Sequence, residues 1–199
     1  MPPVFTIGHS TRPIEELLAL LAEPGVEVLM DVRRYPGSRR HPQFSRDALA
    51  EALGAAGINY MHEPRLGGRR AARPDSPHTA WRVEAFRGYA DHMETPEFQE
   101  ALEGLIDLSR ETTVGILCAE AVPWRCHRRL ISDALVARGL EVRHILGPGR
   151  ADRHEIDPNA QVLEGGRRLV YAGPPPVQGE LFGEEFGGES AAESFRPPR

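Results

Sequence analysis

Short apolar runs alternate with helix-length amphipathic segments, and this alternation constrains the fold more than any other feature. The apolar runs cover residues 4–7, 26–32, 58–62, 113–117 and 141–146, with helical patterns near residues 11–22, 45–55, 79–92, 96–110 and 130–136. Strands that alternate with helices form βαβ units, which place parallel strands in one sheet and helices on its faces. We therefore predict an α/β fold of three layers, with a mainly parallel five-stranded sheet and helices on both faces.

The pattern ends near residue 150, and this sets the predicted domain organisation. We expect residues 1–150 to form a single α/β domain, residues 151–173 an irregular C-terminal extension, and residues 174–199 a flexible acidic tail rich in Gly and Pro. A chain of 199 residues is long enough for one such domain with a substantial core. We find no long apolar segment and no apolar leader, so we expect a cytoplasmic protein with reduced thiols and no membrane contact.

Polar residues follow each of the first four predicted strands. They are His9 and Ser10 after the first, Asp31, Arg33 and Arg34 after the second, His62 and Glu63 after the third, and Cys118 and Glu120 after the fourth. In an open parallel sheet the ligand site lies beyond the carboxyl ends of the strands. These side chains are therefore expected to meet at one edge, with the Asp31 and Glu120 carboxylates partly buried.

Residues 118–129, CAEAVPWRCHRR, are the densest group of reactive side chains, and they lie at a predicted strand-to-helix junction. A thiol at a helix N-terminus beside cations has a lowered pKa, which favours the thiolate. We therefore expect Cys126 to react or to contact a ligand, whereas Cys118 fits either that role or a small core residue. The candidate catalytic residues are Cys118, Glu120, Cys126 and His127.

Three specific chemistries fit this segment poorly by spacing. A phosphatase-like loop would need glycines between Cys118 and Arg125, and Glu120 would repel a phosphate there. Residues 29–33 faintly resemble a rhodanese strand end, but the glycine-rich active loop is missing. Zinc sites usually contain close ligand pairs with two to four intervening residues, and seven residues separate Cys118 from Cys126. We therefore expect no metal and no cofactor.

The basic residues suggest phosphate binding. The net charge of -5 argues against a globally basic nucleic-acid binder, yet all 24 basic residues are arginine, whose planar fork suits bidentate phosphate contacts. Arginines cluster after three predicted strands, at Arg33, Arg34, Arg39 and Arg40, at Arg65, Arg69, Arg70 and Arg73, and at Arg125, Arg128 and Arg129. We expect Arg33, Arg34, Arg125 and Arg128 to bind phosphates near His9 and Ser10, with Asp31 orienting arginines; the alternative is solvated loops paired with the 29 acids.

The tail contains one short motif, Gln178-Gly-Glu-Leu-Phe182. It resembles the Gln-x-x-Leu-Phe peptide by which bacterial replication and repair proteins dock on the DNA sliding clamp. Leu181 and Phe182 are otherwise hard to explain in an acidic, Gly-rich stretch. We expect Gln178, Leu181 and Phe182 to bind such a partner.

Six spaced motifs together resemble a known family. They are TIGHST at residues 6–11, DVRR at 31–34, PQF at 42–44, LGGR at 66–69, YADHME at 89–94, and CAE at 118–120 with CHRR at 126–129. In this order they resemble the bacterial and archaeal domain of unknown function 488 family, over about residues 4–146. The resemblance implies a single α/β domain and no particular reaction. Its shared polar motifs match His9, Ser10, Asp31, Arg33, Cys118, Glu120, Cys126, His127 and Arg128.

These patterns predict an enzyme that acts on a phosphate-bearing substrate, a nucleotide or nucleic acid, in DNA maintenance. A non-catalytic nucleic-acid-binding module tethered by the tail motif is one alternative. A thiol-dependent protein of rhodanese-like or redox-sensing type is another.

Overall fold

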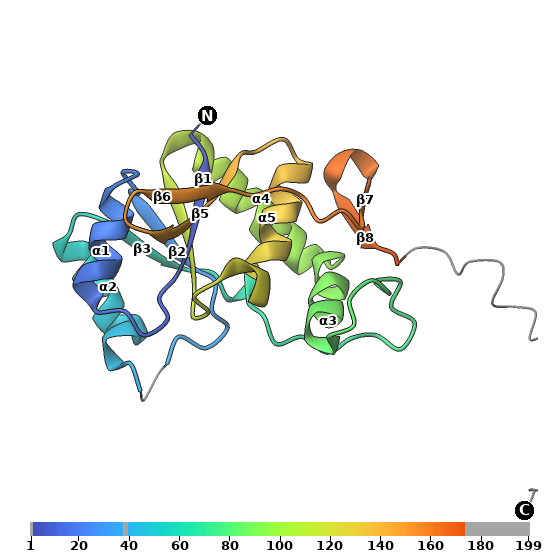
Figure 1. The fold of residues 1–199 in the computed structure, drawn as a ribbon, viewed down its shortest axis with the longest axis horizontal. Helices are drawn as coiled ribbons and strands as arrows, with labels where there is room; N and C mark the ends of the chain where they lie inside the picture. The colour runs from blue at the N-terminus through green and yellow to red at the C-terminus, as the bar shows by residue number, and fades with distance from the viewer. Residues whose placement is uncertain (1, 38–39, 174–199) are drawn as a thin grey trace, which may run out of the picture.

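A six-stranded sheet in the order β3-β2-β4-β1-β5-β6 runs through the centre of the protein (Figure 1). The computed structural model describes residues 2–37 and 40–173. The strands are β1 (Val4–Gly8), β2 (Val28–Asp31), β3 (Asn59–His62), β4 (Val114–Cys118), β5 (Val142–Gly147) and β6 (Arg150–Arg153). The first five are parallel, and β6 is antiparallel to β5. This confirms the predicted α/β fold and adds a sixth strand.

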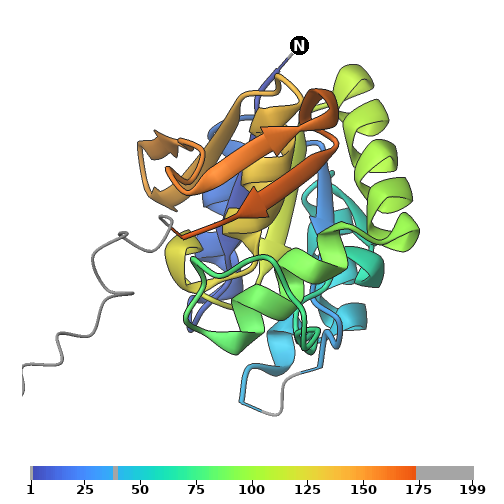
Figure 2. The same ribbon diagram turned by 90° about the vertical axis from the view of Figure 1, so that its right-hand side faces the viewer.

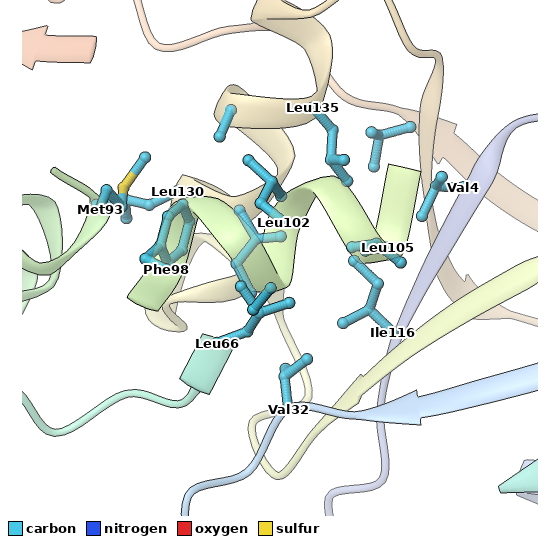
Figure 3. Packing of buried hydrophobic residues seen from close by; sticks show 14 of the residues in the cluster. Val4, Val32, Leu66, Met93, Phe98, Leu102, Leu105, Ile116, Leu130 and Leu135 are labelled. Carbon is cyan, nitrogen blue, oxygen red and sulfur yellow. The ribbon is translucent and has the colours of Figure 1, made fainter. Parts of the chain in front are cut away.

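Helices cover both faces of the sheet. The first face carries α1 (Ile14–Ala22) and α2 (Arg46–Ala55), and the second carries α3 (Glu84–Met93), α4 (Pro96–Glu111) and α5 (Arg128–Ala137). Successive strand side chains point to opposite faces, so Phe5 and Ile7 pack with α1 and α2, whereas Val4 joins the core beneath α4 and α5. Figure 3 shows the second core, in which Phe98 and Leu102 lie against side chains from the strands and α5.

The connections place a topological switch point between β1 and β4. The chain leaves β1 through α1 on the first face, and it leaves β4 through α5 on the second face. These two strands are neighbours, with Gly8 paired to Cys118 in register. A crevice at such a point is where open α/β sheets bind ligands, so the carboxyl ends of β1 and β4 become the first place to look for a site.

The segment 151–173, predicted to be irregular, contains regular structure. Beyond β6 it forms a two-stranded hairpin of β7 (Ala160–Leu163) and β8 (Arg168–Tyr171), joined through the 3₁₀ helix η4 (Glu164–Gly166). The hairpin lies over α5 (Figure 2), and the η4 end approaches the backbone of Ala137 so closely that a Cβ on Gly166 would clash. The sequence pattern hid these strands because β6 reads Arg-Ala-Asp-Arg and β7 is mostly exposed.

The helix predicted over residues 79–92 begins only at Glu84. Residues before it contact β8 instead, and the Ala80 amide donates a hydrogen bond to the Tyr171 carbonyl at 3.0 Å.

Within the described residues, no helix is both long enough and apolar enough to cross a membrane. The tail motif with Gln178, Leu181 and Phe182, and the predicted tail 174–199 as a whole, lie outside the described residues.

Candidate functional site

Two thiols and an imidazole meet at the carboxyl end of β4. Cys118 ends β4, and the 3₁₀ helix η3 (Pro123–Arg125) turns the chain back so that Cys126 and His127 lie beside it at the start of α5. The Sγ atoms of Cys118 and Cys126 are 3.9 and 3.7 Å from Nδ1 of His127, and all three atoms lie within 4.8 Å of one another. Both cysteines are free and buried. We call these three residues the thiol–imidazole cluster.

Packing, more than hydrogen bonding, holds the His127 ring. The Tyr89 ring centroid lies 5.0 Å away, and a Cβ on Gly68 would come within 2.8 Å of His127 Nδ1. Nε2 of His127 is buried and has no hydrogen-bond partner among the described residues. The second glycine of the LGGR segment therefore serves a close approach to the cluster, a role that sequence reasoning had not assigned.

Arg128 lies almost completely buried beneath the loop after β4, at 1 % exposure. One Nη donates to Thr6 Oγ1 at 3.2 Å and the other to the Glu120 carbonyl at 2.6 Å, while Nε has no partner among the described residues. No carboxylate in residues 2–37 and 40–173 forms an ion pair with this guanidinium. A buried cation without a paired anion is costly. A thiolate at one of the neighbouring cysteines would offset the positive charge of Arg128.

The electrostatics of the two thiols differ. A hydrogen bond from Cys118 holds the pKa of Cys126 well below its usual range, and His127 and the positive charge of Arg128 act in the same direction against burial. The pKa of Cys118 is raised by the same hydrogen bond and by burial. Of the two thiols, Cys126 is therefore the one whose lowered pKa favours the thiolate.

A second buried group surrounds Asp31. Arg33 grips both Asp31 oxygens, through Nε at 2.8 Å and Nη2 at 2.6 Å, and its Nη1 donates to the Phe44 carbonyl at 2.8 Å. The Tyr60 hydroxyl donates to Asp31 at 2.8 Å. Both Asp31 oxygens are therefore occupied by neighbouring side chains, and the carboxylate pairs with Arg33. Because Arg33 is engaged below the surface, it is poorly placed to hold a phosphate.

His9 joins this group as a neutral ring. Its Nε2 lies 3.2 Å from Arg33 Nη1, its Nδ1 lies 2.9 Å from the Ser10 carbonyl, and it stacks on Phe44 with centroids 4.3 Å apart. Burial lowers the pKa of His9 to about 4, so the ring is uncharged at neutral pH. Ser10, with a positive φ of 49°, turns the chain away from the sheet at this point.

Several predicted residues lie on the loops that follow the strands of the sheet. Arg40, Arg69 and Arg125 are exposed and Arg34 is half-buried, and Arg34 donates to the Arg69 carbonyl at 3.0 Å, which joins the loops after β2 and β3. Glu120 is exposed, so the expectation of partial burial was wrong: β4 ends at Cys118, and the next two residues turn outward. We call Arg34, Arg40, Arg69 and Arg125 the arginine rim.

Sequence reasoning missed a chain of buried hydrogen bonds that begins at Arg128. Thr6 Oγ1 lies 2.7 Å from His144 Nδ1, and His144 Nε2 lies 2.9 Å from His154 Nδ1. His154 Nε2 then lies 2.8 Å from Asp133 Oδ1. The signal available was a lone polar residue inside an apolar run, as with Thr6 in β1 and His144 in β5.

Fold and site together define an α/β protein whose switch point holds buried thiols and whose rim carries arginine. A family model described as domain of unknown function DUF488 matches residues 13–135, which is more than half of the chain, and the protein belongs to this family. The predicted family is thus confirmed. The match includes the thiol–imidazole cluster and the rim, and it leaves out β1 and the strands from β5 onward. No curated protein and no solved structure matches the chain.

Proposed function

We propose that the arginine rim binds a phosphate-bearing ligand, a nucleotide or single-stranded nucleic acid, above the buried thiols. The observation that carries this proposal is a group of four arginines, on the loops after β2, β3 and β4, that form no ion pair with any described acid. Arginines elsewhere, such as Arg46 and Arg153, also lack an ion pair within the described part of the chain, so the position of the rim is what counts. It follows the carboxyl ends of the strands, where Arg34 donates to the Arg69 carbonyl and joins the loops after β2 and β3. Cations at this edge without paired acids favour an anionic partner.

Exposed aromatic rings support a nucleic-acid ligand over a simple anion. Tyr35, in the loop after β2, is 65 % exposed, and Trp124, in η3 after β4, is 55 % exposed. The Arg34 guanidinium lies 5.6 Å from the Tyr35 ring centroid. Proteins that bind single strands combine such cations with rings on which unpaired bases stack.

A salt titration tests the proposal. Four phosphate contacts on a single strand predict that log K falls with log salt with a slope of about -2.8, or about a 50-fold loss between 50 and 200 mM salt. The assay is fluorescence anisotropy of a labelled DNA oligonucleotide. Arg69→Ala and Arg125→Ala should each reduce the slope by about 0.7, while Arg110→Ala, whose arginine pairs with Asp107, is the matched control. The proposal would be refuted by a wild-type affinity that does not change with salt concentration. It would also be refuted by rim variants whose salt slope equals that of the control.

Thiol chemistry is the second candidate, and the adjacency of the two sulfurs favours it. They lie within 4.8 Å of each other, so a modest movement brings them to disulfide distance. Cys126 would attack a substrate disulfide and release one thiol, and Cys118 would then displace the second, leaving a Cys118–Cys126 disulfide and a substrate reduced by two electrons. Mass spectrometry after incubation with oxidised glutathione should show loss of two hydrogens in wild type. Persistent free thiols would remove this candidate.

The tail motif remains part of the proposal for DNA maintenance. Gln178, Leu181 and Phe182 follow the last described strand, β8, and would tether the α/β domain to a DNA sliding clamp. The tether would raise the local concentration of the rim near DNA without any further contact.

A further inference from the structure

We infer that Cys118, Cys126 and His127 form a binding site for a divalent metal ion of the zinc type. Two thiolates and an imidazole are the ligands that Zn²⁺ prefers, and soft sulfur ligands disfavour Mg²⁺ and Ca²⁺. The ligand atoms come from two elements, the end of β4 and the start of α5, and they lie within 4.8 Å of one another. This site does not depend on nucleic-acid binding at the rim.

The distances match a tetrahedral ion. With metal–sulfur bonds of about 2.3 Å and a metal–nitrogen bond of about 2.1 Å, neighbouring sulfur and nitrogen ligands lie about 3.6 Å apart. The two sulfur–nitrogen distances here are 3.9 Å from Cys118 and 3.7 Å from Cys126. Both sulfur–nitrogen distances therefore lie within a few tenths of an ångström of those around a tetrahedral ion.

The orientation of the His127 ring supplies a second indication. Its Nδ1 faces the Sγ atoms of Cys118 and Cys126, at distances too long for strong hydrogen bonds. The packing of Tyr89 and the close approach of Gly68 hold the ring in this orientation. Nδ1 is therefore already directed at the point where an ion between the two sulfurs would lie.

Charge balance indicates what the fourth ligand would be. Within the described part of the chain, the cluster contains three ligand residues and no fourth Cys, His, Asp or Glu. A bound ion deprotonates both thiols, whose charges then offset a divalent ion, and the nearby buried Arg128 leaves the site with a net positive charge. Three protein ligands with one open position are typical of catalytic rather than structural zinc. We expect the open position to take hydroxide or another small anionic oxygen ligand.

Cobalt substitution tests the site directly. The full chain is reduced, stripped with a chelator and titrated with Co²⁺ alone. We expect one ion per chain, with sulfur-to-cobalt charge-transfer absorption and the strong visible bands of a tetrahedral ion, both lost on addition of Zn²⁺. Because the chain contains only Cys118 and Cys126, any sulfur-to-cobalt band must come from this cluster.

Variants separate the site from misfolding. Cys126→Ser and His127→Ala should lose Co²⁺ affinity at least 10-fold, and His41→Ala, outside the cluster, should bind like wild type. Gly68→Ala changes no ligand, but its new methyl group would lie 2.8 Å from Nδ1, so it should weaken binding about 10-fold, in the range seen for residues that orient ligands. Circular dichroism checks that each variant is folded.

Each possible result of the cobalt titration either supports or overturns the metal site. A Co²⁺ complex without a sulfur band, or a Cys126→Ser variant that binds like wild type, would overturn the site, and so would a folded wild type that retains no Co²⁺. Arg69→Ala and Arg125→Ala should leave Co²⁺ binding unchanged. Failure of the rim proposal and failure of the metal site are therefore distinguishable.

Discussion

Mild acid should destabilise this protein because two histidines are buried as neutral rings. Burial lowers the pKa of His9 to about 4. Burial, followed by the positive charges of His154 and Arg128, lowers the pKa of His144 to about 3. In the unfolded chain both would titrate near the ordinary value of about 6.5. The folded state therefore takes up these two protons at a lower pH than the unfolded state does.

The sign and size of the change in the free energy of unfolding follow from this difference in pKa. Between pH 6.5 and the folded-state values the unfolded chain binds more protons, so the free energy of unfolding falls as the pH falls through that window. At pH 5 both folded rings are still mostly neutral, and the loss relative to pH 8 is about 2 kcal/mol for each histidine, or about 4 kcal/mol together. Carboxylates with lowered pKa values, such as Glu63 and Glu94, act only at lower pH.

Urea denaturation at pH 8, 6.5, 5.5 and 5 measures this loss. His144→Asn should be less stable than wild type at pH 8, but its stability should fall about 2 kcal/mol less between pH 8 and pH 5. Tyr171→Phe is the matched control, because it weakens the same hydrogen-bond chain at Asp133 without removing a histidine. Its pH dependence should equal that of wild type. Parallel curves for wild type and His144→Asn would refute the reasoning.

Three further predictions concern two buried contacts and the tail motif. Asp31→Asn leaves Arg33 buried without its carboxylate, so urea denaturation should show a loss of about 3–5 kcal/mol in the free energy of unfolding. Asp107→Asn, at the exposed pair with Arg110, should cost under about 1 kcal/mol, and equal costs for the two variants would contradict this account. Tyr171→Phe removes a buried donor from Asp133 and should cost about 1–3 kcal/mol at pH 8, and a neutral substitution would show that the contact contributes nothing. Leu181→Ala with Phe182→Ala should abolish capture of the protein on immobilised sliding clamp, and unchanged capture would exclude the tether.

The sequence allowed the layers to be predicted but not the sheet edges. Periodicity is local, so runs such as residues 113–117 marked strands that are buried on both faces. Strand order depends on contacts between distant segments, and no pattern within one strand encodes it. The edge strand β6 and the hairpin β7–β8 were missed because their stability comes from pairing with β5 and from Tyr171, which is fully buried.

Part of the geometry at the strand ends could also be predicted from local sequence patterns. The strand-end rule placed His9, Asp31 and Cys118 at one edge, since it depends only on the direction of parallel strands. The spacing rule for zinc predicted no ligand cluster, because it describes ligands on one tight turn. Here the η3 turn closes a seven-residue gap and returns Cys126 to the strand end. Whether a cation is buried or exposed also depends on tertiary contacts, so the sequence did not separate Arg128 from Arg125.

A chain of buried hydrogen bonds from Arg128 links the C-terminal strands to the thiols. Arg128 can only donate, so the Thr6 oxygen accepts from it, and the same oxygen contacts His144 Nδ1. His144 Nε2 then contacts His154 Nδ1, and His154 Nε2 contacts the Asp133 carboxylate. His144 and His154 lie beyond residue 135, where the family match ends. We therefore expect a chain truncated after α5 to lose the fixed position of Arg128, and with it the environment that favours the Cys126 thiolate.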